Sequence, residues 1–173
     1  HSILDGSQSL IDNYVGGLVG TAIHSTIEDV KVSSEIYCNG SIRTWACGGV
    51  VGSIEGNSLI QRVSTNTTIQ GQNTINAGGL AGRVSTSTVD VTNIRNSTSQ
   101  GNIIALGGIA HNGAGGLIGL LKRNAHVEDC SSTGNVETLA SEGHAGGLVA
   151  SVANNATIKR SYSTANVIKN TFS

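Results

Sequence analysis

Apolar residues along the chain recur with a period of about thirty residues, far longer than the period of one helix or strand. A five-residue unit, Gly-Gly followed by two apolar or small residues and then Gly or Ala, occurs five times. The copies begin at Gly16, Gly48, Gly78, Gly115 and Gly146. Their starts are 32, 30, 37 and 31 residues apart, so we place five repeats in one domain over residues 1–173.

A second unit follows each pentapeptide and is bounded by two aliphatic residues nine positions apart. The pairs are Ile27 and Ile36, Ile60 and Ile69, Ile94 and Ile103, Val127 and Val136, and Ile158 and Val167. No stretch in either unit is suited to a long helix, because Gly, Ser, Thr and Asn interrupt any helical period. The third repeat has an insertion within 83–93: Gly82 and Ile94 are 12 residues apart, whereas Gly52 and Ile60 are 8 apart.

Short β-forming stretches that return with this period predict an all-β fold, a parallel β-solenoid (β-helix) of about five coils. Equivalent residues then stack about 4.8 Å apart and form ladders. The predicted core ladder is Leu18, Val50, Leu80, Leu117, Leu148, Ile27, Ile60, Ile94, Val127 and Ile158. Leu117→Asp should abolish cooperative unfolding, and Thr86→Asp in the insertion should have little effect. A sandwich of β-hairpins is the alternative, but hairpins do not require a fivefold register.

Charges support this alignment of the repeats. The two residues after each opening aliphatic residue should point outward. In order they are Glu28-Asp29, Gln61-Arg62, Arg95-Asn96, Glu128-Asp129 and Lys159-Arg160. No like charges adjoin in either column, and like charges on neighbouring strands would be destabilising.

These residues resemble the GLUG-motif repeat. The best matching stretch is Gly-Gly-Leu-Val from Gly146, followed by Ile-Lys-Arg-Ser-Tyr-Ser-Thr-Ala-Asn-Val over 158–167; residues 127–136 match almost as well, and the first two repeats match least. The resemblance implies an extracellular, cell-surface setting, as in adhesin-like proteins and the non-catalytic regions of immunoglobulin A-cleaving peptidases. By analogy we expect a right-handed coil. The motif carries over no catalytic residue.

Composition and charge narrow the possible partners. A net charge of −1 gives no broad electrostatic attraction to nucleic acid or to an anionic membrane surface. No apolar run approaches the roughly 20 residues of a membrane-spanning helix. We therefore expect neither a nucleic-acid partner nor membrane insertion.

The sequence offers little catalytic chemistry. The five histidines (His1, His24, His111, His126 and His144) do not have the HExxH spacing of a zinc peptidase. Glu128 and Asp129 beside Lys159 and Arg160 are better explained as a structural charge ladder than as the carboxylates of a glycan-cleaving enzyme. Ice binding would need threonines at matched positions in successive coils, which the sequence lacks. We predict no enzyme activity, no metal and no cofactor.

The three cysteines differ in position. Cys130 shares an inner column with Val30 and Val63, so we expect a buried thiol. Cys38 and Cys47 lie nine apart in one connection, where a disulfide is possible if the protein is secreted and the geometry allows it. Sequons at Asn39, Asn66, Asn96 and Asn155 are about as numerous as chance predicts.

Both termini fall at the same phase of the repeat, without a polar cap, and the chain contains no Met. This predicts either a segment of a longer array or copies that stack head to tail, with Lys159-Arg160 of one copy facing Glu28-Asp29 of the next. The predicted function is a non-catalytic structural or adhesive module of an extracellular array or filament. The alternative is a region that binds a carbohydrate or glycoprotein within a larger secreted enzyme such as a peptidase, with 83–93 as its contact.

Overall fold

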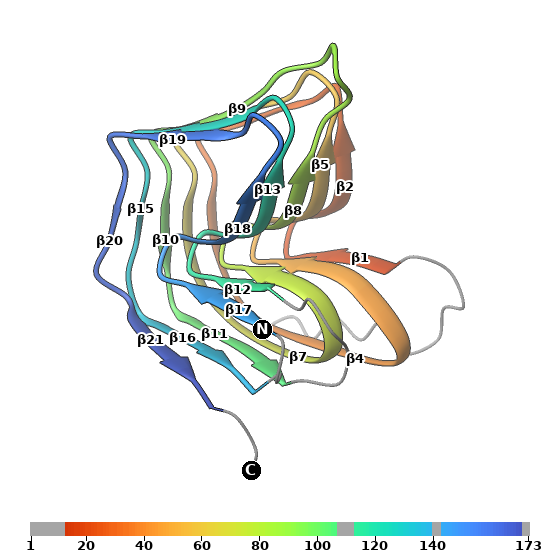
Figure 1. The fold of residues 1–173 in the computed structure, drawn as a ribbon, viewed down its shortest axis with the longest axis vertical. Helices are drawn as coiled ribbons and strands as arrows, with labels where there is room; N and C mark the ends of the chain where they lie inside the picture. Colours follow the sequence, from red (N-terminus) through yellow and green to blue (C-terminus); the bar gives the residue numbers. More distant parts are fainter. Residues whose placement is uncertain (1–12, 107–112, 140–142, 171–173) are drawn as a thin grey trace.

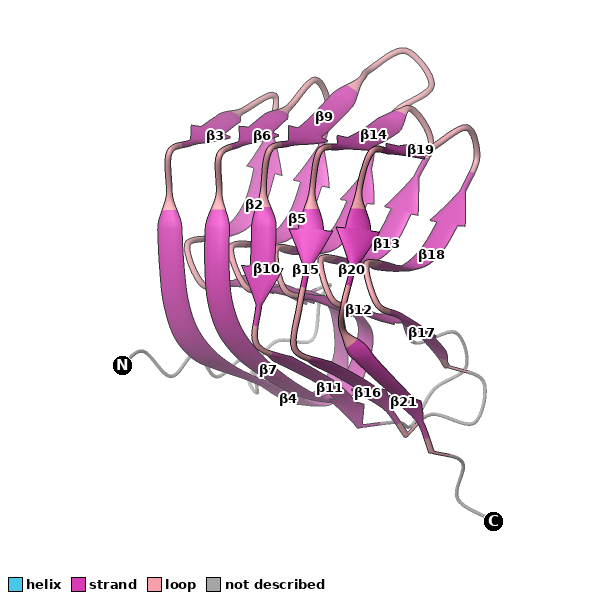
Figure 2. Cartoon of the chain, turned by 90° about the vertical axis from the view of Figure 1, so that its left-hand side faces the viewer, coloured by secondary structure: helices cyan, strands magenta, loops and turns pink. Residues whose placement is uncertain are grey.

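The computed structural model describes residues 13–106, 113–139 and 143–170, except for the side chains at 39–44, 73 and 75. These residues form a parallel β-solenoid, seen along its axis in Figure 1 and from the side in Figure 2. The predicted sequon residue Asn39 and the histidines His1 and His111 lie outside the described side chains.

Each coil has four sides, and the pentapeptides open the first. The pentapeptide side comprises β2 (Val19–Ile23), β5 (Val51–Glu55), β8 (Ala81–Ser85), β13 (Ile118–Lys122) and β18 (Val149–Ala153). The charged side comprises β3 (Thr26–Glu28), β6 (Leu59–Gln61), β9 (Thr92–Arg95), β14 (Ala125–Glu128) and β19 (Thr157–Lys159).

The other two sides join at a bend. The long side comprises the first parts of β4 (Lys31–Gly48) and β7 (Ser64–Gly78), then β10 (Thr98–Gln100), β11 (Asn102–Leu106), β15 (Ser131–Ser132), β16 (Asn135–Thr138), β20 (Tyr162–Ser163) and β21 (Asn166–Lys169). The closing side comprises β1 (Asn13–Gly16), the last parts of β4 and β7, β12 (Gly113–Gly115) and β17 (His144–Gly146). In the third and fourth coils, Gly101 (φ 121°) and Gly134 (φ 105°) divide the long side into two strands.

The strands pair in the register that the repeat predicts. Every pair among the described strands is parallel. The opening aliphatic residues stack as Ile27, Ile60, Ile94, Val127 and Ile158. The closing ones stack as Ile36, Ile69, Ile103, Val136 and Val167.

The number of complete coils is smaller than predicted. Five Gly-Gly corners bound only four complete turns, and the last corner is followed by a partial turn that the structure describes as far as residue 170. The expectation of about five coils therefore counted corners rather than turns.

The coil encloses two cores rather than the single narrow interior that one ladder suggests. The first core lies among the pentapeptide side, the charged side and the upper half of the long side, and includes Val50, Ile60, Leu80, Leu117 and Leu121. The second core lies between the lower half of the long side and the closing side, and includes Ile36, Ile69, Ile103, Ala77 and Ala114. The nine-residue spacing therefore joins residues of two different interiors.

A polar waist separates the two cores. Thr65 Oγ1 donates a hydrogen bond to the carbonyl oxygen of Gly79 (2.8 Å), and Ser132 Oγ donates one to that of Gly147 (2.6 Å). These hydroxyls come from the long side and reach the second glycine of a pentapeptide across the coil. A Cβ at Gly79 would collide with Ser99 Oγ, so the close approach requires glycine there.

Six of the ten predicted ladder residues are fully buried: Val50, Leu80, Leu117, Ile60, Ile94 and Val127. Ile27 and Leu148 are partly buried against the first core. Leu18 is 52% exposed and Ile158 is 38% exposed, so the expectation of burial is wrong for these two. Both lie in outermost coils, where no described strand covers one side of them.

The insertion occupies the corner between β8 and β9. Residues 86–91 leave the coil there, and Val89 is 84% exposed. Thr86, however, is 1% exposed, and its hydroxyl donates to the carbonyl oxygen of Ser87 (3.1 Å). Aspartate at this position would bury a charge, so the expectation that Thr86→Asp is harmless was wrong.

Candidate functional site

The predicted charge columns lie on the outer surface at the corner between the charged and long sides. Each of these corners contains one residue in the left-handed region, where L-residues are uncommon. The five residues are Asp29 (φ 57°), Arg62 (53°), Asn96 (50°), Asp129 (52°) and Arg160 (43°). The sharp turn points each side chain outward, next to the corresponding residue of the neighbouring coil.

Opposite charges on neighbouring coils form ion pairs at these corners. Arg62 contacts Asp29 (Nε to Oδ1, 2.6 Å) and Glu28 (Nη2 to Oε2, 2.9 Å). Arg160 contacts both Asp129 (Nε to Oδ1, 2.8 Å) and Glu128. The hydrogen bond from Arg62 holds the pKa of Asp29 below its ordinary value, and Arg160 does the same for Asp129.

The four residues predicted to meet between stacked copies lie at opposite ends of the solenoid. Glu28 ends β3 and Asp29 follows it, at one edge of the charged side. Lys159 ends β19 and Arg160 follows it, at the other edge. Within the described residues, Lys159 has no ion pair, whereas the other three are paired to the coil beside them.

The end that carries Lys159, which we call the second end, is apolar as well as basic. It is formed by β17, β18, β19, β20 and β21, each of which pairs with one described strand. Its exposed hydrophobic residues are Val152 (46%), Ile158 (38%), Tyr162 (64%), Val167 (42%) and Ile168 (37%). Open strand edges combined with exposed aliphatic side chains make this end suited to pairing with another coil.

The cysteines fall into two environments. Cys38 and Cys47 form a disulfide inside the second core, which the sequence left undecided. Cys130 is free and buried in the first core, as expected. Burial raises the pKa of the Cys130 thiol to about 11, so this cysteine is a poor nucleophile at neutral pH.

A groove that sequence reasoning missed runs along the outside of the coil, where the pentapeptide and closing sides meet at an angle. Its volume is about 310 Å³, and its lining includes Trp45, Asn76, Arg83, Lys122 and His144. Arg83 and Lys122 come from β8 and β13, and the other three come from the closing side. Outward-facing positions of the pentapeptide side vary from repeat to repeat, so periodicity gave no signal for this groove.

Two further properties bear on function. Among the described residues, no helix is long and apolar enough to cross a membrane. Within the same ranges, no group of three or more His, Cys, Asp or Glu side chains is arranged to hold a metal ion.

Parallel strands stacked in register over four turns define a β-solenoid repeat protein. The family model of the GLUG motif matches residues 12–37 and 110–137, so two regions of the chain carry the GLUG repeat motif. The matches are the first and fourth repeats. The first was expected to be among the weakest, and the fifth, whose residues 158–167 read closest to the motif, lies outside the matched ranges. No curated protein and no solved structure gives a significant match.

Proposed function

We propose that this chain is a non-catalytic structural module that stacks end to end with further coils, from a longer array or from another copy, in an extracellular assembly. The observation that carries the proposal is the second end, where five described strands each have one strand partner and aliphatic side chains are 37–46% exposed. A coil placed against this end would bury that apolar surface and satisfy the backbone groups of the edge strands.

Polarity of the stack follows from the parallel strands. A coil that continues the parallel sheets runs in the same direction, so the first end of one copy (β1, β2, β3 and the long-side part of β4) meets the second end of the next. In that arrangement, Lys159 of one copy faces Glu28 of the next. A contact between two second ends would instead bring the positively charged Lys159 of both copies into one interface. Charge therefore favours a directional array over a closed dimer.

The extracellular setting is supported by two independent features. The Cys38–Cys47 disulfide suits an oxidising compartment. The GLUG resemblance implies surface and secreted proteins, including adhesin-like ones, and we extend the proposal to an adhesive role on that basis. The alternative of an accessory region in a larger secreted enzyme needs a lateral binding surface instead of open ends.

The test compares association of three proteins by analytical ultracentrifugation and electron microscopy. The unmodified chain should associate with increasing concentration and form elongated particles. Ile158→Lys/Val167→Lys should remain monomeric, because two lysines replace apolar side chains at the second end. Val89→Lys, at an exposed residue of the insertion, should behave like the unmodified chain. An unmodified chain that stays monomeric up to about 1 mM would overturn the proposal.

A further inference from the structure

The lateral groove carries a separate inference, which does not depend on end-to-end stacking. Its two walls belong to different sides of the coil: Arg83, Leu120 and Lys122 lie on the pentapeptide side, and Trp45, Asn76 and His144 lie on the closing side. These residues come from successive coils, so the groove follows the solenoid axis. Coils repeat about every 4.8 Å, which makes the groove suited to an extended, linear ligand.

Arg83 is held in place by the protein itself. Its Nη1 atom donates to Tyr14 Oη (3.1 Å) and to Glu55 Oε1 (3.3 Å). Ser53 Oγ donates to the same carboxylate oxygen (3.3 Å), so Glu55 is also fixed. The Arg83 side chain is only 21% exposed. This network positions a guanidinium group at the groove before any ligand arrives, which lowers the entropy cost of binding.

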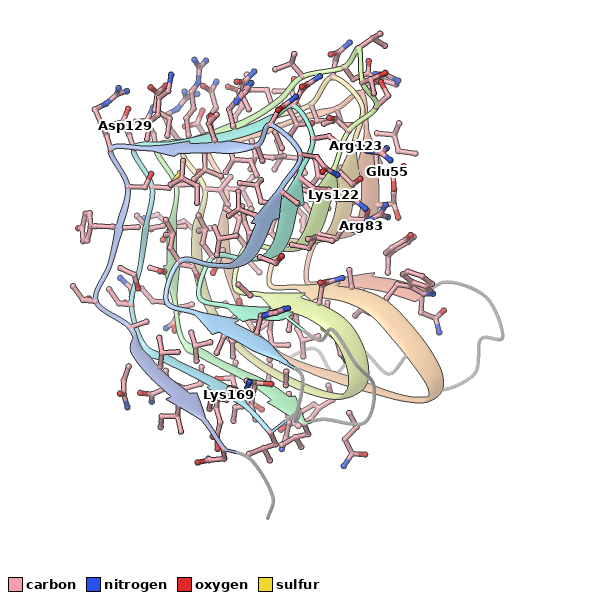
Figure 3. All side chains as sticks on the ribbon, viewed as in Figure 1. Glu55, Arg83, Lys122, Arg123, Asp129 and Lys169 are labelled. Carbon is pink, nitrogen blue, oxygen red and sulfur yellow. A yellow bond between two sulfur atoms is a disulfide. The ribbon has the colours of Figure 1, made fainter. Side chains whose placement is uncertain are left out.

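Positive charge is in excess around Arg83. Lys122 lies on the next coil and Arg123 follows it, and Figure 3 shows both on the same outer face as Arg83 and Glu55. Within the described residues, Glu55 is the one carboxylate paired with Arg83, Lys122 has no ion pair, and Asp90 lies with Arg83 and Arg123 around an adjacent pocket. Burial, together with the charges of Arg83 and Arg123, lowers the pKa of Lys122. An anion in the groove would offset this repulsion, whereas the chain as a whole carries a net charge of −1.

The opposite wall adds groups of a different kind. Trp45 is 37% exposed and offers part of an indole surface. Asn76, which is 5% exposed, donates its amide nitrogen to the carbonyl oxygen of Trp45 (3.2 Å) and so ties two neighbouring coils of this wall together. An aromatic surface, a fixed guanidinium, a lysine and the polar residues Asn76 and Ser151 line one concave site, which matches a ligand that has an apolar face, a negative charge and hydroxyl groups.

We propose that this groove binds a glycan that bears carboxylate groups, with the carboxylate at Arg83 and Lys122 and a sugar ring against Trp45. An acidic peptide fits less well. Arg83 and Lys122 lie on β8 and β13, which are paired on both sides, so a peptide bound at these two residues could not add to the sheet as a further strand. Nucleic acid would need a broader basic surface than Arg83 and Lys122, the two cations that line the groove on a chain of net negative charge.

The experiment measures binding by isothermal titration calorimetry with three acidic probes: hexagalacturonate, a hyaluronate hexasaccharide and sialyllactose. Fully methyl-esterified hexagalacturonate and poly-glutamate serve as comparison ligands. At least one acidic glycan should bind, the ester should lose most of the affinity, and poly-glutamate should bind weakly. Which acidic probe binds distinguishes uronate from sialate as the carboxylate source.

Matched variants test the site. Lys122→Glu should weaken binding by roughly tenfold or more, because it places a carboxylate beside the bound one. Lys169→Glu makes the same charge change on β21, away from the groove (Figure 3), and should change binding by less than about twofold. Trp45→Ala should weaken glycan binding and leave any poly-glutamate binding unchanged. Melting curves check that each variant is folded.

The inference would be overturned by any of three results. The acidic glycans do not bind at concentrations up to about 1 mM; poly-glutamate binds as tightly as they do; or Lys169→Glu weakens binding as much as Lys122→Glu. None of these results bears on stacking through the second end, so the two proposals fail separately.

Discussion

The two cores of each coil are held together by different means. Leucine, isoleucine and valine from three sides fill the first core, including Val50, Leu80 and Leu117. In the second core, a wall of Ile36, Ile69, Ile103 and Val136 faces small residues of the closing side, and a disulfide joins its outer part in the first coil. The part of the coil around the first core, the first lobe, is thus stabilised by the volume of its apolar side chains. The part around the second core, the second lobe, is stabilised by the close approach of two strand layers and by a covalent bond.

The GLUG matches do not cover the two lobes equally. They cover 12–37 and 110–137, which include the closing-side strands β1 and β12, the pentapeptide side, the charged side and the long side as far as Ile36 and Val136. Residues 38–47, which contain the bend of β4, lie outside the matches. The connections from the closing aliphatic residue to the next pentapeptide also differ in length: Ile36 and Gly48 are 12 residues apart, whereas Ile69 and Gly78 are 9 apart.

The largest effect should come from the first core. Leu117→Ala should lower the free energy of unfolding by about 3–5 kcal/mol, since Leu117 is fully buried between two neighbouring coils and the structure cannot collapse around the void. Chemical denaturation measures this change. Val89→Ala, at an exposed loop residue, is the control and should change stability little. An equal loss in both variants would contradict the assignment of the first core.

The second core should depend on its covalent bond. Cys38→Ala/Cys47→Ala should lower the free energy of unfolding by about 2–4 kcal/mol, because the disulfide restricts the unfolded chain. Hydrogen exchange should show the loss of protection in the bend of β4 rather than at Leu117. A reducing agent should lower the melting temperature of the unmodified protein and leave the double variant unaffected. If the variant lost protection uniformly, the two lobes would not be energetically distinct.

A smaller effect is expected at the waist between the lobes. Ser132→Ala removes the hydroxyl that donates to Gly147, and we expect a loss of about 1 kcal/mol in denaturant unfolding. Ser131→Ala, its more exposed neighbour in β15, provides the control. If Ser132→Ala left the free energy of unfolding unchanged, the polar contact between the two cores would contribute nothing to stability.

The smallest effect concerns the exposed corner charges of the first lobe. Because Arg62 lowers the folded-state pKa of Asp29 relative to the unfolded chain, this ion pair stabilises the protein above the unfolded-state pKa. The stabilisation is lost as the pH falls through the lower, folded-state pKa. Melting temperatures measured from about pH 6 to pH 2 should therefore fall slightly less steeply for Asp29→Asn. A steeper fall would contradict the sign of the shift.

The sequence predicted the register of the fold better than its cross-section. Identical spacing in five repeats aligned Ile27, Ile60 and Ile94 correctly, because parallel coils stack equivalent residues. That spacing shows that Ile27 and Ile36 both point inward but not that they face different interiors. Leu18 and Ile158 were wrongly expected to be buried because the ladder was treated alike in all five repeats, whereas the first and last coils have a neighbouring coil on one side only among the described strands.

The surface sites show the same contrast between what the repeat predicts and what only the folded chain reveals. Glu28, Asp29 and Arg160 stood out because their charges alternate with the repeat, and the structure pairs them with neighbouring coils. Arg83 occupies a column with Thr21, Ser53, Leu120 and Ser151, whose chemistry follows no repeat. Only the folded chain brings Arg83 next to Tyr14 and across from Trp45.

The corner between β8 and β9 has a practical consequence for protein engineering. Residues 86–91 extend from it, yet β8 still pairs with β5 and β13, and β9 with β6 and β14, in unbroken register. Because the solenoid accommodates extra residues at this corner without a change in strand register, the corner is a suitable place to insert foreign sequences. Foreign loops inserted at the equivalent corners, between β5 and β6 or between β13 and β14, would project from one edge of the rod at intervals fixed by the coil spacing, and the host would act as a molecular ruler.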